Sequence, residues 1–378
     1  MRILCVLQTL RAGGAQRVFS LMADVWIAEA HDVSLLLFTD DSEPDFTPVH
    51  PDVDIRRLGI LGTTSGGILH KIGKNLKRFP VVRKAVSEIR PDCVIGFMID
   101  ENLVLRLSTL GMRVPIILVE HSPYSYDPGY LKRMLQDIVY PLADGVVMLT
   151  RQAKAHAVGS VRSRTVVIEN PIRIPEDLSS RQLAEKETTG KKVEGVFLAI
   201  GRFARQKRFD RLIWAFSKIA DTCPGWKVHL YGSGDEEESM RTLVAELGLE
   251  NCVFLKGAVK EPWSALAEGD VFVMSSDTEG FPMALIEAMA CGLAVVSTDC
   301  PTGPGELVVD GLNGLLVSVD EEALAAGMLR LATDASLRHK LGAEATKIKE
   351  RLGCERIMTR YNGFIAACRS TGKETLRV

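Results

Sequence analysis

The sequence has no long hydrophobic run, no paired cysteine motif and no marked net charge. No segment approaches the roughly 20 apolar residues that a membrane-spanning helix needs. The opening apolar run Ile3–Leu7 is too short for the core of a secretion signal. The formal net charge of −2 argues against a protein that binds nucleic acid. We therefore expect a cytoplasmic protein, and peripheral attachment to the cytoplasmic face of a membrane stays open.

The eight cysteines are scattered along the chain, and no C-x-x-C pair occurs among them. Most of them lie inside apolar stretches, and no histidine is spaced from them as a zinc ligand would be. We expect buried, reduced thiols, with neither a disulfide framework nor a metal site. The acidic pair Asp52 and Asp54 falls in a polar loop and is interpreted as surface. No metal or other cofactor is expected.

Aromatic residues make up only 6% of the chain, yet 46% of its residues are hydrophobic, and 378 residues suffice for two separate cores. Apolar runs alternate with helical stretches in both halves, which is typical of parallel, doubly wound α/β sheets. The expected strands lie near residues 2–9, 32–38, 55–59, 92–98, 114–120, 144–150 and 165–169, and then near 196–201, 227–231, 252–255, 271–275, 293–298 and 314–317. The polar stretch 174–192 between the two series predicts a linker.

Two carboxylates with seven residues between them, Glu279 and Glu287, mark the most informative segment, E-G-F-P-M-A-L-I-E. The run 271–275 before it predicts a buried strand, and 283–290 predicts a helix with proline at its first position. Gly292 is expected to end that helix. The turn between strand and helix consists of Gly280, Phe281 and Pro282.

A strand end followed by a glycine turn and a helix start leaves unpaired backbone N–H groups. A diphosphate is favoured there by hydrogen bonds and by the helix dipole. Glu279 precedes the helix and Glu287 lies about one and a half turns inside it, where carboxylates can accept hydrogen bonds from sugar or ribose hydroxyls. Taken alone, the segment equally fits an ordinary helix start with a solvated glutamate, because short motifs recur by chance.

A second turn suited to anions follows the first predicted strand of the second half, in the segment 201–210, G-R-F-A-R-Q-K-R-F-D. Arg202 and Lys207 fall in the loop before a helix predicted over 211–220, for which Asp210 is the expected N-cap. Arginine offers a planar fork of donors and lysine a point charge, a combination expected around a diphosphate leaving group. A solvated basic turn is the alternative interpretation.

The pattern G-R-x4-K-x2-D followed by E-x7-E resembles the C-terminal half of the retaining glycosyltransferases of family 4, which have the GT-B fold. Near the N-terminus, the loop with Gly13 and Gly14 resembles the family's Gly-Gly-x-Glu-Arg loop, with Gln16 where the family has Glu. The substitution removes a charge, but the two glycines still allow the backbone to approach a phosphate closely. Segments 167–171 and 297–306 resemble the family's boundary motif and a loop of members that use UDP-linked sugars.

The resemblance covers nearly the whole chain and implies an α/β protein of GT-B fold. Such a protein has two Rossmann-like, doubly wound domains that face each other across a cleft. The resemblance predicts an acceptor-binding domain over 1–173, the linker 174–192 and a donor-binding domain over 193–353. It also predicts a C-terminal helical segment, 354–378, that crosses back onto the first domain.

The resemblance also implies roles for individual residues around the donor. Arg202, Lys207 and the helix start at Pro282 would stabilise the departing nucleoside diphosphate, so that no metal is needed. Glu279 would hydrogen-bond the donor sugar and orient it. Glu287 would bind the ribose.

Other positions have expected roles with structural alternatives. His121 follows the predicted strand 114–120, at the strand end where ligands bind, and is predicted to contact the transferred sugar or the acceptor. A lone buried histidine without function is the alternative. The turn 231–235 is predicted to lie near the nucleotide base; a truncated dinucleotide-binding fingerprint is the alternative, but its third glycine is absent. The turn of Leu255, Lys256 and Gly257 is predicted to contact the base through its backbone, and an ordinary loop is the alternative.

Basic and apolar residues interleave from His70 to Lys84. Cations recur there at helical spacings of three and four, while apolar residues form a second stripe. The resulting cationic face is predicted to bind the diphosphate of a lipid-linked acceptor or an anionic membrane surface, although a solvated helix face is the alternative. Its residues are Lys71, Lys74, Lys77 and Arg78.

The predicted function is transfer of a hexose or N-acetylhexosamine from a nucleotide-sugar to a hydroxyl group, with retention at the anomeric carbon. UDP is favoured as the carrier of the sugar, and a lipid-linked saccharide is favoured as the acceptor. Two alternatives share the scaffold: a nucleotide-sugar 2-epimerase, which needs no acceptor, and a non-catalytic module that binds nucleotide-sugars. The full set of two cations and two carboxylates, together with the cationic face, favours transfer.

Overall fold

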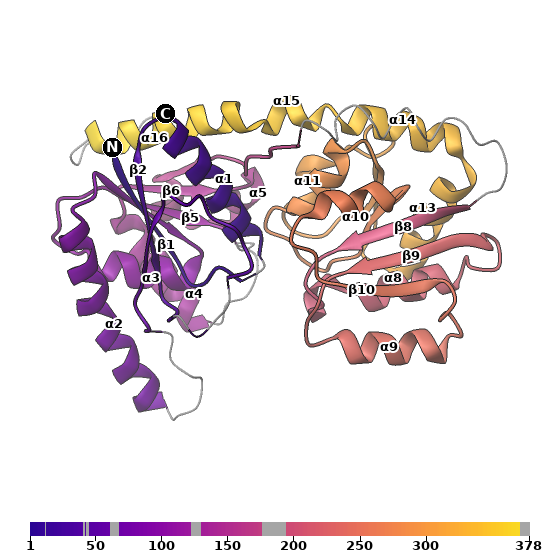
Figure 1. The fold of residues 1–378 in the computed structure, drawn as a ribbon, viewed down its shortest axis with the longest axis horizontal. Helices are drawn as coiled ribbons and strands as arrows, with labels where there is room; N and C mark the ends of the chain where they lie inside the picture. The colour runs from indigo at the N-terminus through magenta and orange to yellow at the C-terminus, as the bar shows by residue number, and fades with distance from the viewer. Residues whose placement is uncertain are drawn as a thin grey trace. The chain divides into compact units, whose positions relative to one another are not determined.

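The computed structural model describes residues 1–11, 13–40, 42, 45–60, 68–121, 130–175 and 194–370, with the backbone alone described at 68–76 and 130. These residues form two compact units (Figure 1). The first unit runs from Met1 to Pro171 and includes the C-terminal segment from Cys354 onward, and the second runs from Ile172 to Gly353. Most of the predicted linker 174–192 lies outside the described residues.

The first unit contains a parallel sheet whose described strands follow the order β3-β2-β1-β4-β5-β6-β7. These strands are β1 (Arg2–Leu7), β2 (Asp32–Leu37), β3 (Asp54–Arg57), β4 (Cys93–Phe97), β5 (Ile116–Glu120), β6 (Gly145–Met148) and β7 (Thr165–Val167). All the strands predicted for this half are confirmed. The strands β4, β5 and β6 are buried at every position, which explains why their sequences are almost entirely apolar, with Glu120 at the end of β5 as the exception.

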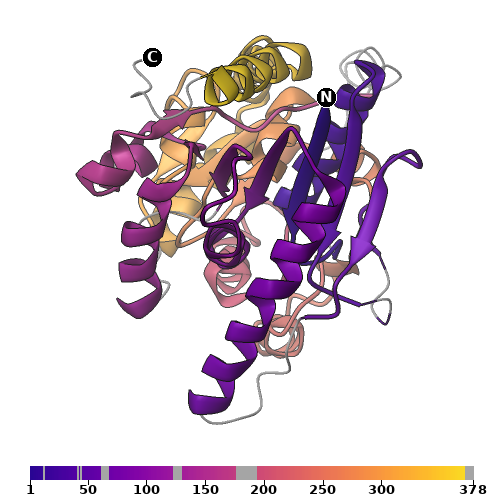
Figure 2. The same cartoon turned by 90° about the vertical axis from the view of Figure 1, so that its left-hand side faces the viewer.

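Helices connect these strands and pack on the sheet. They are α1 (Gly14–Ala28), α2 (Ile68–Ile89), α3 (Ile99–Ser108), α4 (Tyr130–Val139), the 3₁₀ turn η1 (Tyr140–Leu142), α5 (Arg151–His156) and α6 (Gly159–Arg162). Helix α2 packs beside α3, and α3 packs beside α4; α2 is the long helix nearest the viewer in Figure 2. The predicted basic helix is confirmed as part of α2, and its apolar residues Phe79 and Val82 contact the core.

The C-terminal helix α16 (Cys354–Ser370) belongs to the first unit, although it follows the second unit in the chain. The indole Nε1 of Trp26 in α1 donates to Asn362 Oδ1 at 2.9 Å. Gly145 leaves room for Phe364, because a Cβ at that position would collide with the phenyl ring. A chain segment far from the first unit in sequence therefore completes its core.

The second unit contains a parallel sheet with the described strands in the order β10-β9-β8-β11-β12-β13. These strands are β8 (Glu194–Ile200), β9 (Gly225–Tyr231), β10 (Val253–Gly257), β11 (Val271–Met274), β12 (Ala294–Thr298) and β13 (Leu315–Val317). Every strand predicted for this half is confirmed, so the expectation of two doubly wound α/β domains is confirmed as well. The helices are the 3₁₀ turn η4 (Arg205–Lys207), α8 (Phe209–Ser217), α9 (Glu237–Glu246), α10 (Pro262–Glu268), α11 (Met283–Ala290), α12 (Pro304–Leu307), α13 (Glu321–Thr333), α14 (Ala335–Ala345) and α15 (Ile348–Leu352).

The strand order of the second unit reverses between β8 and β11. From β8 the chain proceeds to β9 and β10 on one side, and β11 continues to β12 and β13 on the other. Loops that leave two such strands diverge, and open α/β sheets bind ligands in the crevice between them. The loops at this switch point are 201–208 and 275–282, which contain the two predicted anion-binding turns.

Two local predictions at these loops are wrong in detail. Helix α8 begins at Phe209, and Asp210 lies in its first turn without capping it, because the Asp210 carboxylate bonds the guanidinium of Arg208. Helix α11 spans Met283–Ala290 as predicted, but Pro282 is its N-cap residue and not its first helical residue. Gly292, at φ 77°, follows the helix end as expected.

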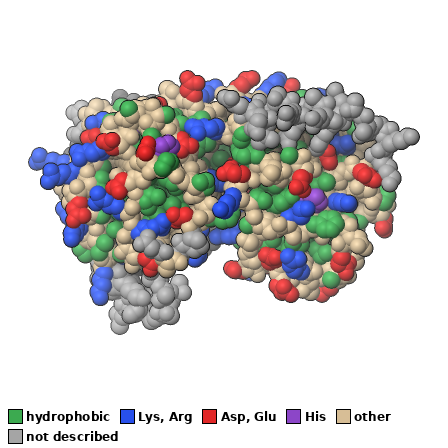
Figure 3. Space-filling model, in the orientation of Figure 1, with side chains coloured by type: hydrophobic (Ala, Val, Ile, Leu, Met, Phe, Trp, Pro, Cys, Tyr) green, Lys and Arg blue, Asp and Glu red, His purple; other side chains and the backbone are tan. Residues whose placement is uncertain are grey.

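Acidic and basic side chains alternate over the face of the molecule in Figure 3, in keeping with the net charge of −2. None of the described helices is both long and apolar enough to cross a membrane.

Candidate functional site

Two of the predicted donor-site residues form an ion pair at the switch point of the second unit. Lys207 Nζ lies 2.6 Å from Glu279 Oε1 and 2.9 Å from Oε2. The Glu279 residue is only 7% exposed, and the hydroxyl of Ser276 donates a further bond to its Oε1 at 2.6 Å. The carboxylate is thus fixed by a cation from one loop and a hydroxyl from its own loop. Sequence reasoning missed Ser276, although its position three residues before Glu279 was a usable signal.

Further hydrogen bonds join the same two loops. The hydroxyl of Ser275 donates to the Lys207 carbonyl at 3.0 Å, and the Asp277 amide donates to the Gln206 carbonyl at 2.9 Å. Arg211, only 5% exposed, donates to the Ser275 carbonyl at 2.7 Å and to Asp277 Oδ1 at 2.6 Å. Buried charged hydrogen bonds of this kind rigidify their surroundings when all partners are satisfied. The loop geometry therefore depends on Arg211, which was not predicted.

The start of α11 is positioned by a third loop. The Glu279 amide donates to the Pro301 carbonyl at 2.7 Å, and the Thr302 amide donates to the Glu279 carbonyl at 2.8 Å. A Cβ on Gly303 would lie 2.6 Å from Pro282 Cδ, so glycine is needed for this close approach. The first N–H groups of α11 have no carbonyl partner within the helix, and the helix dipole adds positive potential there. This fixed helix start is suited to an anion.

Glu287 and two thiols lie close to this region. Glu287 is buried, at 1% exposed, on α11. Burial raises the pKa of Cys291 to about 11, with Glu287 adding to the effect, and burial together with Glu279 raises the pKa of Cys300 to about 12. Both thiols are therefore neutral at physiological pH. Across the described part of the chain, no cluster of three or more His, Cys, Asp or Glu side chains could hold a metal ion; independence from metals stays a prediction.

Arg202 is exposed on the loop after β8. The turn that contains Gly232 and Gly234 packs closely against this loop. A Cβ on Gly232 would collide with the Gly201 carbonyl, and one on Gly234 would collide with the Phe203 carbonyl. Both glycines also have positive φ, 156° and 155°. The turn 231–235 therefore supports the loop that carries Arg202, which is a structural use of its glycines. Its predicted contact with a base stays a prediction.

The third predicted turn ends β10. Gly257 has φ 81°, and its carbonyl accepts from the Gly232 amide at 2.9 Å, so this turn is joined to the turn after β9. Lys256 is exposed and Leu255 is half-buried. The carboxyl ends of β8, β9 and β10 are thus connected by backbone bonds.

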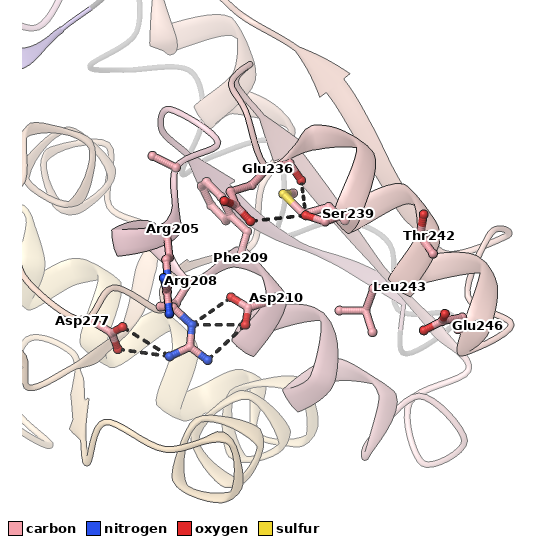
Figure 4. Close-up of a pocket in the computed structure, with 12 residues that line it drawn as sticks. Arg205, Arg208, Phe209, Asp210, Glu236, Ser239, Thr242, Leu243, Glu246 and Asp277 are labelled. Carbon is pink, nitrogen blue, oxygen red and sulfur yellow. Dashed lines mark hydrogen bonds and ion pairs between the residues drawn. The ribbon is translucent and has the colours of Figure 1, made fainter.

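A pocket lies between the loop after β8, the start of α8 and helix α9 (Figure 4). Arg208 lies in it between Asp210 and Asp277 and donates to both carboxylates. These bonds, first those to Asp210, raise the pKa of Arg208 above its usual value. The lining is of mixed charge and does not include Arg202, Lys207, Glu279 or Glu287.

The first unit carries the predicted histidine. His121 follows β5, is half-buried, and stacks on Phe97 at the end of β4 with 5.4 Å between ring centroids. Its Nε2 is buried and has no hydrogen-bond partner among the described residues. Burial lowers the pKa of His121 to about 3, so the imidazole is neutral at physiological pH. A neutral ring nitrogen at the carboxyl ends of parallel strands is suited to hydroxyl groups.

The glycine loop of the first unit precedes α1. Gly13 is the N-cap residue of α1 in extended conformation, and Gly14 is the first helical residue. A Cβ on Gly13 would collide with the amide of Gln16, which is 9% exposed and folds back over the loop. The glutamine that replaces the usual Glu therefore packs against the turn that it follows.

Only part of the predicted cationic face can be compared with the structure. Lys77 is exposed, whereas Arg78 is half-buried and donates from Nε to the Ile60 carbonyl at 3.0 Å. The side chains of Lys71 and Lys74 lie outside the described residues. Arg78 thus stabilises the turn after β3. Among the residues of the predicted cationic face whose side chains the structure describes, Lys77 remains as an exposed cation.

Sequence families match both halves of the chain. Residues 180–348 match the family Glycosyl transferases group 1, and residues 12–174 match Glycosyltransferase Family 4. A relative from Campylobacter jejuni, GalNAc-α-(1→4)-GalNAc-α-(1→3)-diNAcBac-PP-undecaprenol α-1,4-N-acetyl-D-galactosaminyltransferase, is 26% identical over 343 residues, covering 90% of this chain and 91% of that protein.

Solved structures of similar fold cover nearly the whole chain. Sucrose-phosphate synthase from Thermosynechococcus elongatus superposes with a TM-score of 0.81 at 21% identity, over 97% of this chain and 99% of that one. Anabaena HepE in complex with UDP and glucose superposes with a TM-score of 0.75 at 20% identity, over 97% of this chain and 100% of that one. At this level of identity the similarity establishes the fold.

Replacing His121 with Gln is expected to reduce the loss of stability in acid. An unfolded imidazole takes up a proton near pH 6.5, whereas the buried His121 ring does so only near its pKa of about 3. Between these values the unfolded state binds the extra proton, so wild-type stability falls as the pH is lowered, by up to about 1.4 kcal/mol per pH unit. Thermal unfolding at several pH values across this range measures the difference.

The exposed His156 of the same unit provides the matched control. His156→Gln should keep the acid sensitivity of the wild type. Equal acid sensitivity in wild type and His121→Gln would show that the ring of His121 is not buried in its neutral form.

Proposed function

This chain belongs to the glycosyltransferases of family 4, of GT-B fold, and from that premise we propose that it transfers a hexose or N-acetylhexosamine from a UDP-linked donor to a hydroxyl of a lipid-linked saccharide, with retention at the anomeric carbon. The observation that carries the proposal is the Lys207–Glu279 ion pair at the switch point of the second unit, next to the fixed start of α11. It combines a cation, a carboxylate and free backbone donors within two neighbouring loops.

The chemical step breaks the bond between the anomeric carbon and the diphosphate oxygen, and UDP leaves with that electron pair. The acceptor oxygen forms the new bond on the same face, and its proton passes to the departing phosphate oxygen. Charge that develops on the diphosphate is stabilised by Arg202, by Lys207 and by the N–H groups at the start of α11. Fixed donors of this kind each contribute roughly a few kcal/mol in the transition state.

Lys207 has donors for both of its proposed contacts. An ammonium group carries three N–H donors, and two suffice for the bonds to Glu279 Oε1 and Oε2. The third is available to a phosphate oxygen. Glu279, fixed also by Ser276, orients the donor sugar through its hydroxyls, and Glu287 binds the ribose.

The relatives support the choice of donor and acceptor. HepE was solved with UDP and glucose, which favours UDP as the carrier. The name of the Campylobacter jejuni relative describes an acceptor linked to undecaprenol through a diphosphate, which favours a lipid-linked saccharide. We therefore also propose that the protein works at the cytoplasmic face of a membrane, and that the cations Lys71, Lys74 and Lys77 bind the lipid diphosphate or the anionic headgroups. Of these, Lys77 is exposed on α2.

Nucleotide binding is expected to raise the thermal stability of the wild type in a base-specific way. A ligand that binds only the folded state stabilises it by about 2.7 kcal/mol at a concentration 100-fold above its Kd. UDP and UDP-sugars should raise the melting temperature, and GDP and ADP should not. Lys207→Ala and Glu287→Ala should each lose most of the shift, because they remove the diphosphate and ribose contacts.

Glu238→Ala is the matched control, since Glu238 is an exposed glutamate on α9 of the same unit. It should shift with UDP as the wild type does. The absence of any shift with saturating nucleotide would contradict a donor site, and equal shifts in Lys207→Ala would place the nucleotide elsewhere.

Turnover of a UDP-sugar is expected to require a lipid-linked saccharide acceptor, and the product should keep the anomeric configuration of the donor. Proton NMR of the product measures the anomeric coupling, and EDTA should leave the rate unchanged because the proposed site uses protein cations alone. Conversion of the UDP-sugar without acceptor would indicate an epimerase. An inverted linkage would contradict the same-face mechanism.

A further inference from the structure

One charged residue beside the proposed donor site has a strained backbone. Arg208, which joins the 3₁₀ turn η4 to helix α8, has φ 49° and ψ 46°. This left-handed conformation is unfavourable for residues that carry a Cβ, whereas glycine adopts it without strain. A strained residue persists only when its surroundings fix it, and such residues cluster at functional sites. The contacts of Arg208 identify what fixes it.

The side chain of Arg208 is bound by two carboxylates (Figure 4). Its Nε donates to Asp210 Oδ1 at 3.0 Å, and its Nη2 donates to Asp210 Oδ2 at 3.0 Å. Its Nη1 donates to Asp277 Oδ2 at 3.2 Å. A planar guanidinium group has enough donors to hold two carboxylates at once. The strained residue therefore connects the first turn of α8 to the loop after β11.

Asp277 is fixed by further contacts. Its Oδ1 accepts from Nη2 of Arg211 at 2.6 Å, and its amide donates to the Gln206 carbonyl at 2.9 Å. Arg211 is only 5% exposed, so its charged hydrogen bond to Asp277 is screened less by water than a surface ion pair would be. Two guanidinium groups and a backbone bond thus hold Asp277 against the segment 206–211.

The Arg208–Asp277 pair joins the same two loops as the Lys207–Glu279 pair. Arg208 follows Lys207 directly in the chain, and Asp277 precedes Glu279 by two residues. Arg208 and Asp277 line a pocket whose lining does not include Lys207 or Glu279, and we assign them no contact with the donor. A shift of either residue would nevertheless move its neighbour in the donor site, because the chain between them is short.

We propose that Arg208 and Asp277 are positioning residues. Their ion pair holds the loop of Lys207 at the distance from the loop of Glu279 at which both residues reach the donor, and it keeps the backbone of Arg208 in its left-handed conformation. The reaction that the pair supports rests on the proposed function. Positioning of this kind acts on the rate, because a displacement of about 1 Å that starts far from the reacting atoms can lower a rate about a hundredfold.

Steady-state kinetics test this inference, with UDP-hexoses and UDP-N-acetylhexosamines as donors and an undecaprenol-diphosphate-linked saccharide as acceptor. Arg208→Gly should lower kcat by about tenfold to a hundredfold, because Lys207 and Glu279 are then less well oriented in the transition state. The KM for the UDP-sugar should stay within about threefold of wild type, since the proposed base and ribose contacts are unchanged. Asp277→Asn keeps an acceptor for Arg211 and should lower kcat to a similar extent.

The double variant shows whether the two residues act as a pair. If each acts through the other, Arg208→Gly combined with Asp277→Asn should have about the same kcat as either single variant. Effects of the two substitutions that multiply would overturn the proposal.

The melting temperature separates positioning from a purely structural role. Arg208→Gly relieves the left-handed backbone and Arg208→Ala does not, so the glycine variant should melt above the alanine variant. Both should lose kcat equally at a temperature well below their melting transitions, and UDP should still raise the melting temperature of both. Arg205→Ala is the control, since Arg205 is an exposed arginine of the same loop, and it should keep the wild-type kcat.

A folded Arg208→Gly protein with the wild-type kcat would overturn the proposal. So would an alanine variant that melts above the glycine variant, because the strain at Arg208 would then be absent. A strong loss of thermal stability and of UDP binding in the glycine variant would also overturn it, since the role would be structural. A wild type that binds UDP but transfers no sugar to the acceptor would instead contradict the proposed function, and with it the reaction assigned to the pair.

Discussion

The ion pair between Lys207 and Glu279 is the interaction on which the proposed donor site depends. It joins the loop after β8 to the turn before α11 across the point where the strand order reverses. Both groups are partly or fully removed from water, so their attraction is screened less than that of a surface pair, and the loss of either would leave the other without its partner. The pair therefore constrains the positions of the cation and the carboxylate before any substrate binds.

The surrounding contacts maintain this constraint. Arg211 fixes the loop of Ser275 and Asp277, and the glycines at 232 and 234 allow the turn after β9 to pack against the loop that carries Arg202. Such preorganisation matters because donors that are already oriented stabilise a developing charge without reorganising during the reaction. In the first unit, burial favours the neutral forms of two groups near the carboxyl ends of β4 and β5, Glu101 and His121.

The strands could be predicted because parallel strands buried on both faces read as continuous apolar runs, and the bounds of α11 followed from its flanking proline and glycine. The pairing of Lys207 with Glu279 was not predictable, since 72 positions separate them and only the sheet order brings their loops together. Arg211 looked like an ordinary residue of a surface helix, and the expected cap at Asp210 failed because Arg208 competes for its carboxylate. Glu101 gave no signal either, because burial of one acidic residue between two polar neighbours, Asp100 and Asn102, depends on tertiary packing.

A crystal structure of the protein with UDP tests the central claim most directly. The account predicts that the diphosphate lies at the start of α11, within hydrogen-bond distance of backbone N–H groups of Phe281 and residues 283–285 and of Lys207 Nζ, and that the ribose contacts Glu287. Lys207 should still contact Glu279 in that complex, since the ammonium has enough donors for both. UDP bound in the pocket beside Arg208, or a diphosphate that touches neither α11 nor Lys207, would contradict it.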